Sequence, residues 1–163
     1  MRWLSPIVLL AISSVVVAQR ADDQVANILR LHAIEREGHL KGDAHMVTSF
    51  LADSFVSVQN GKVEVQSREQ VRRNFAEYLA GVVYSSWDDL MKPSVHISAD
   101  GTMAWAVIQI KARFREKNDS TQTIQEFTSS WIAAYEKRAS AWQMVGISSG
   151  CNPPCGSPPD AKQ

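Results

Sequence analysis

The order of its hydrophobic patterns constrains this chain most. A helical pattern runs from Asp22 to about Lys41, with Val25, Ile28 and Leu29 on one face. Two shorter helical patterns follow, and long alternating patterns typical of strands then fill residues 82–98, 103–115, 121–135 and 142–148. Helices followed by a run of antiparallel strands predict an α+β domain.

Turn and cap residues divide the first half of the chain. Gly42 suits a helix C-cap, and Asp43 suits the N-cap of a short helix that carries Val47, Phe50 and Leu51 inward. Asn60-Gly61 predicts a tight turn between strands at 55–59 and 62–65. A capping box is also expected, Ser67 with Gln70, opening a helix that ends at Gly81.

Two breaks are expected among the later strands. Pro93 interrupts the long alternating stretch at an edge or bulge, and Asp100-Gly101 turns the chain. The last two strands should be joined through Lys137-Arg138.

The N-terminus has the layout of a secretory signal peptide. Arg2 precedes a short apolar run, and the small or short residues Val16 and Ala18 stand before polar Gln19. An uncleaved membrane anchor is the alternative, but the apolar run is shorter than the roughly 20 residues that a span needs. We therefore expect a signal peptide at 1–18, a domain at 19–150, and a secreted or periplasmic protein with no membrane contact after cleavage.

Composition argues against nucleic acid as a partner. The chain has 17 basic and 17 acidic side chains, whereas nucleic-acid binders usually carry a basic excess. No phosphate-binding loop, dinucleotide fingerprint or histidine motif for zinc is present, so neither a cofactor nor a metal is expected.

The two cysteines, Cys151 and Cys155, stand close together in a Pro-rich tail at 151–163. In an exported protein such a pair is expected to form a disulfide. Free or redox-active thiols and half of a metal site are the alternatives, although two thiolates without nearby histidines make an incomplete zinc site.

Several short motifs, in their order and spacing, resemble a known family. They are Lys41-Gly42-Asp43, Phe50-Leu51-Ala52-Asp53-Ser54-Phe55, Asn60-Gly61, Ser67-Arg68-Glu69, Asp100-Gly101-Thr102-Met103-Ala104, Phe127-Thr128 with Trp131, and Trp142-Gln143-Met144-Val145. Together they resemble the SnoaL-like, DUF4440-type branch of the NTF2-like superfamily, over about residues 24–149. The resemblance implies a strongly curved antiparallel sheet wrapped around three helices as a cone, a pocket at its open end, and a homodimer through the outer sheet face.

The resemblance also tests one activity. A ketosteroid isomerase of this fold needs a carboxylate base, together with a phenol and a protonated acid that hold the oxyanion. Counted from Gly42-Asp43, the phenol position holds Glu35, and the base position falls near Gln59, which takes up no proton at neutral pH. The DUF4440 pattern also departs at Glu126, Ser129 and Ser148, so no catalytic residue is named.

The remaining pocket candidates come from strand alternation. Glu126, Thr128 and Ser130 share one strand face, and Phe127, Ser129 and Trp131 share the other. We predict that the Glu126 face looks inward, because a lone acid is easiest to explain at a pocket mouth. The full set of pocket candidates is Glu35, Gln59, Trp87, Trp105, Glu126, Thr128 and Ser148.

Two functions remain open, beside a purely structural dimer whose cone is filled with side chains. The first is a domain that binds a small, largely apolar molecule in the cone; the second is a cofactor-free isomerase, dehydratase or cyclase that uses a pocket carboxylate. Folds of this type host many functions, so the fold does not decide between them.

Overall fold

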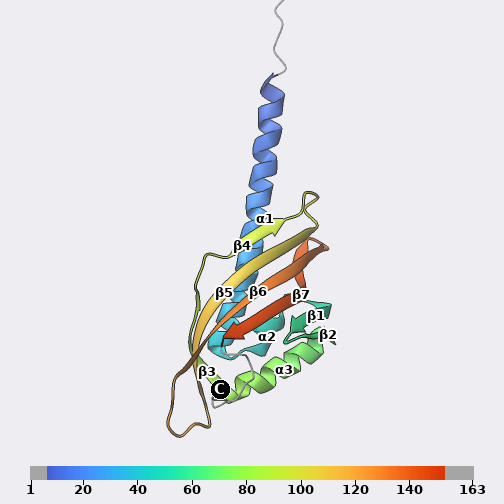
Figure 1. The fold of residues 1–163 in the computed structure, drawn as a ribbon. Coiled ribbons are helices and arrows are strands. Elements are labelled where there is room, and N and C mark those ends of the chain that lie inside the picture. Colours follow the sequence, from blue (N-terminus) through green and yellow to red (C-terminus); the bar gives the residue numbers. More distant parts are fainter. Residues whose placement is uncertain (1–6, 153–163) are drawn as a thin grey trace, which may run out of the picture.

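The computed structural model describes residues 7–152, with side chains described from Asp22 onward. The described elements are α1 (Ile7–Lys41), α2 (Ala44–Thr48), β1 (Leu51–Gln59), β2 (Lys62–Ser67), α3 (Arg68–Gly81), β3 (Val82–Asp89), β4 (Ser94–Ile97), β5 (Met103–Glu116), β6 (Gln125–Arg138) and β7 (Ala141–Asn152). One end of α1 projects beyond the sheet, and α3 crosses the opposite end (Figure 1).

The strands form one curved sheet of seven in the order β2-β1-β7-β6-β5-β3, with β4 paired to another stretch of β5. The predicted α+β class and curved sheet are confirmed. One pairing differs from the antiparallel expectation, because β1 runs parallel to β7. These two strands are far apart in sequence, so no hairpin fixes their relative direction.

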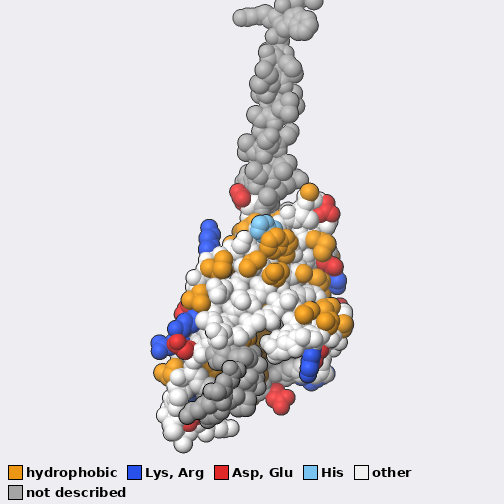
Figure 2. All heavy atoms as spheres, viewed as in Figure 1, with side chains coloured by type: hydrophobic (Ala, Val, Ile, Leu, Met, Phe, Trp, Pro, Cys, Tyr) orange, Lys and Arg blue, Asp and Glu red, His pale blue; other side chains and the backbone are white. Residues whose placement is uncertain are grey.

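The sheet has an apolar outer face as well as an apolar inner one. Val58 pairs with Ser148, Ser148 with Ile132, and Ile132 with Val107, so these side chains form a row across four strands. Val58 and Ile132 are exposed, and so is Trp105, which is two residues before Val107 on β5. Figure 2 shows hydrophobic side chains gathered on this face.

The junction of α1 and α2 follows the predicted caps. Gly42 adopts a left-handed φ of 66°, and the Asp43 carboxylate accepts hydrogen bonds from the backbone N–H groups of His45 and Met46. Gly38 lies against Val47 so closely that an added Cβ would come within 2.7 Å of Cγ2. A glycine is therefore required where the two helices meet. Helix α1 is longer than predicted: it begins at Ile7, whereas the sequence pattern predicted a start at Asp22.

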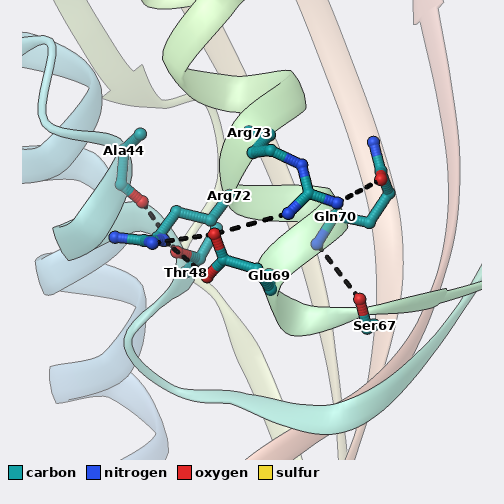
Figure 3. A network of polar contacts seen from close by, with 7 residues as sticks. All are labelled: Ala44, Thr48, Ser67, Glu69, Gln70, Arg72 and Arg73. Carbon is teal, nitrogen blue, oxygen red and sulfur yellow. Dashed lines mark hydrogen bonds and ion pairs between the residues drawn. The ribbon is translucent and has the colours of Figure 1, made fainter.

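The predicted turn and cap before α3 are also present. Asn60 and Gly61 have φ values of 51° and 75°, as a tight hairpin turn requires. The Ser67 hydroxyl accepts a hydrogen bond from the Gln70 backbone N–H at 3.2 Å (Figure 3). The reciprocal bond of the capping box, from the Ser67 backbone N–H to the Gln70 side-chain oxygen, is absent from the described structure, because that oxygen accepts a hydrogen bond from Arg73 instead.

Some strand boundaries differ from the prediction. The stretch 82–98 is two strands, since β3 ends at Asp89 and β4 begins after Pro93. The turn between β6 and β7 lies at Ala139 and Ser140, which both have positive φ, rather than at Lys137-Arg138.

The last strand reaches past the predicted domain boundary. β7 continues to Asn152, which places Cys151 opposite Ser129 in the sheet. Cys155 lies outside the described residues, so the disulfide stays a prediction.

The inner face of the sheet combines small and large side chains, and α1 packs against it at β3 and β4. Ala104, Ala106 and Ala112 on β5 alternate with outward residues and are almost fully buried. Larger inward side chains, Trp131 and Tyr135, stand on the neighbouring strand β6. In the described part of the chain, no helix has both the length and the hydrophobicity needed to cross a membrane.

Candidate functional site

A cavity of about 860 Å³ lies between the inner face of the sheet and the three helices. This volume falls within the range of small-molecule sites. Aromatic side chains dominate its wall: Phe50, Phe55, Phe75, Tyr78, Tyr84, Trp87, Phe114, Phe127 and Trp131. The wall is therefore suited to an apolar or aromatic ligand.

Two polar side chains on consecutive turns of α1 line the cavity among these rings. The Glu35 side chain is 12% exposed, and its Oε2 is buried with no hydrogen-bond partner in the described structure. His39 donates from Nδ1 to the Glu35 carbonyl oxygen at 2.9 Å, so in the neutral ring Nε2 is an acceptor. The His39 ring stacks on Trp87 with centroids 5.3 Å apart, which fixes its orientation.

His32, one turn before Glu35, links this part of the site to β3. Its Nε2 lies 2.8 Å from Asp89 Oδ1, and its Nδ1 lies 3.7 Å from Glu35 Oε2. Burial alone would lower the pKa of His32, but the contacts with Glu35 and Asp89 outweigh it and raise that pKa. His32 thus lies between two carboxylates, which favour its protonated form.

Two buried tyrosines near the cavity differ in hydrogen bonding. The Tyr84 hydroxyl lies 2.6 Å from the Tyr78 hydroxyl. The Tyr135 hydroxyl is buried without a partner among the described residues, as is the Trp131 ring nitrogen. Burial raises the pKa of both Tyr84 and Tyr135, and the charge of Glu35 adds to the shift of Tyr135, so both phenols stay protonated.

The polar part of the lining consists mainly of amides and carboxylates. Gln59, Gln66, Asn74, Asn118 and Gln125 contribute amides. Glu64, Glu116 and Glu126 contribute carboxylates. No lysine or arginine is among the described residues that line the cavity.

The structure brings some predicted site residues together and separates others. Glu35, Gln59 and Trp87 line the cavity. Trp105 does not: it is 44% exposed and stacks on His96 with centroids 3.9 Å apart. Ser148 is exposed on the outer face, and its neighbour Ser149 lines the cavity instead.

The predicted inward face of β6 was wrong. Phe127, Ser129 and Trp131 line the cavity, and Thr128 does not. Glu126 borders the cavity, but its carboxylate contacts Lys111 at 2.7 Å and Arg113 at 3.4 Å, two residues that alternate with the inward side chains of β5. Burying aromatic rings on the inward face outweighs any preference for a single acid there.

Sequence reasoning missed His39, Tyr84 and the pairing of His32 with Asp89. One signal was available: His32, Glu35 and His39 are spaced three and four residues apart, so they share one helix face with buried Ile28. No signal linked Asp89 to that face, because the contact spans 57 residues.

Comparison with solved structures identifies the fold. An NTF2-like superfamily protein from Salmonella enterica subsp. enterica serovar Typhimurium aligns with a TM-score of 0.68 and 13% identity, over 87% of this chain and 99% of that one. A ketosteroid isomerase-like protein from Erwinia carotovora atroseptica aligns with a TM-score of 0.58 and 13% identity, over 82% and 96%. The chain has the NTF2-like fold.

Other comparisons extend this result without assigning a role to the NTF2-like domain. The association domain of C. elegans CaMKII aligns with a TM-score of 0.61 and 17% identity, over 80% of this chain and 97% of that one. No family profile matches the sequence, and no curated protein matches it either. The SnoaL-like, DUF4440-type assignment stays a prediction. Among the described residues, no group of His, Cys, Asp or Glu side chains could hold a metal ion.

Proposed function

We propose that this NTF2-like domain binds a small, largely apolar molecule in its cavity. The observation that carries the proposal is the cavity itself, about 860 Å³, with nine aromatic rings in its wall beside a polar part of amides and carboxylates. Binding sites for small molecules typically combine an apolar wall with a few convergent polar groups. Here Glu35 and His39 are polar groups that would orient the ligand.

Two features of the protein around the site belong to the same proposal. The N-terminal pattern supports export with cleavage after Ala18. The exposed apolar row on the outer sheet face, with Ile132 52% exposed, supports a homodimer through that face. The similarity to an association domain is compatible with self-association.

Native mass spectrometry of protein purified from its own host tests the binding proposal. A retained small molecule is expected in the wild type. Ser149→Trp should lose it, because an indole at this lining position fills part of the cavity. Ser130→Trp is the matched control, since Ser130 is exposed on the other face of β6 and should keep the ligand. Equal retention by both variants would contradict binding in the cavity.

A cofactor-free enzyme is the second candidate, and one observation favours it. Glu35 is a largely buried carboxylate that lines an apolar cavity, with a histidine 3.7 Å behind it. Such a group can take a proton from a bound carbon acid and return it, as an isomerase, dehydratase or cyclase requires. Deuterium exchange into the retained molecule, lost in Glu35→Gln, would support this candidate; no exchange would leave only the binding role.

A further inference from the structure

The cavity lining carries acids but no fixed cation. Four of its described residues are glutamates, and none is lysine or arginine. The negative charge of Glu126 is paired with the positive charges of Lys111 and Arg113. In the described structure, the carboxylates of Glu35, Glu64 and Glu116 form no ion pair with a lysine or arginine side chain. The described lining therefore carries more carboxylates than cations.

The negative charge of the Glu35 carboxylate is not balanced by the neighbouring His32. His32 lies 3.7 Å from the Glu35 carboxylate, but it lies closer to Asp89, at 2.8 Å. Even with His32 protonated, these three groups carry one net negative charge. A carboxylate shielded from water gains strongly from a cation that replaces the lost hydration.

The rest of the wall also favours a positive ligand. Nine aromatic side chains line the cavity, and the faces of such rings attract cations. The Nδ1 of His39 donates to the Glu35 carbonyl, so Nε2 is the ring nitrogen that can accept from a ligand. A group with several N–H donors and a positive charge would satisfy both Glu35 and His39.

We propose that the ligand is an organic cation: an apolar or aromatic body with one protonated amine that donates to Glu35 and lies against the aromatic wall. This inference rests on the proposed binding function and names its ligand class. An anionic analogue of the same body is disfavoured, because it would place a second negative charge beside Glu35.

Three probes that share one ring system separate charge from apolar contact. Naphthylmethylamine is cationic near neutral pH, naphthylmethanol is neutral, and naphthylacetate is anionic. Titration calorimetry with the full exported chain should show the amine binding at least about tenfold more tightly than the alcohol, with the acetate weakest.

Matched variants assign that preference to Glu35. Glu35→Gln should reduce amine affinity at least about tenfold and leave alcohol affinity within about twofold. Glu35→Asp, which keeps the charge, should retain a preference for the amine. Glu37→Gln is the control, because Glu37 is on the same helix but is 52% exposed and contacts Lys41. Circular dichroism melts of each variant establish that it is folded.

The outcomes distinguish this inference from the proposed function. Equal affinity for amine and alcohol in the wild type, or an amine preference that survives in Glu35→Gln, would overturn the cation proposal and leave a neutral-ligand pocket. No binding of any of the three probes would count against both proposals.

Discussion

The two buried tyrosines near the cavity give opposite predictions for the same substitution. Tyr135 is 0% exposed and its hydroxyl has no partner among the described residues, whereas the Tyr84 hydroxyl is hydrogen-bonded to Tyr78. A buried hydroxyl without a partner costs about 1–3 kcal/mol. Tyr135→Phe removes that cost and leaves a void the size of one oxygen atom, which costs a few tenths of a kcal/mol, roughly. We therefore expect it to raise the free energy of unfolding by about 1 kcal/mol.

Tyr84→Phe is the matched control. It removes a hydrogen bond of 2.6 Å, but Tyr78 is 42% exposed and its hydroxyl can turn to water. The loss should therefore be about 1 kcal/mol, the usual net value of one hydrogen bond. The two variants should differ by about 2 kcal/mol, or about 4–8 °C in melting temperature for a domain of this size.

Urea unfolding of ligand-free protein measures both changes, and equal slopes for the variants establish that the unfolding transition is unchanged. If Tyr135→Phe is destabilising by as much as Tyr84→Phe, the Tyr135 hydroxyl has a partner, such as a buried water, and the reasoning is refuted. An unchanged stability for Tyr135→Phe would mean that burying the Tyr135 hydroxyl costs less free energy than is expected for a buried hydroxyl without a partner.

Four further predictions follow from other parts of the molecule. Gly38→Ala should lower the free energy of unfolding by about 1–3 kcal/mol in urea titrations, because the new methyl group overlaps Val47; a gain in stability, as expected for alanine in an open helix, would contradict the close approach. The raised pKa of His32 means that its protonated contacts stabilise the fold below its unfolded pKa of about 6.5, and that this contribution is lost as pH rises through the folded value. His32→Asn should therefore cost more stability near about pH 6 than near about pH 9, and an equal cost at both would count against a charged His32. Intact mass of protein from the native host should show a chain that begins after Ala18, and a species that keeps Met1 would refute cleavage there. Light scattering should give twice the mass of the mature chain, and Trp105→Ser should weaken this association because Trp105 is 44% exposed on the outer face; a monomeric wild type would refute the dimer.

Local signals in the sequence predicted the elements whose structure is decided locally. Asp43 and Ser67 form their caps with backbone groups two or three residues away, and Asn60-Gly61 forms its turn alone. The split between β3 and β4 could be located only roughly from Pro93, because the ends of these strands depend on pairing with β5. Glu35 and Gln59 were predicted by family resemblance, and their position in the lining depends on packing between distant segments.

The excess of carboxylates over cations in the described cavity lining could not be predicted from composition, because it results from strand register. Lys111 and Arg113 stand on β5 between the inward residues Ile110, Ala112 and Phe114. Successive side chains of a strand point to opposite faces, so a shift of one residue in the register would turn both cations toward the cavity. Burial of the apolar residues fixes the register, since Ile110 is 1% exposed and Ala112 is 0% exposed. The same burial that builds the cavity wall therefore keeps lysine and arginine out of it, and leaves Glu35 as a carboxylate available to a ligand.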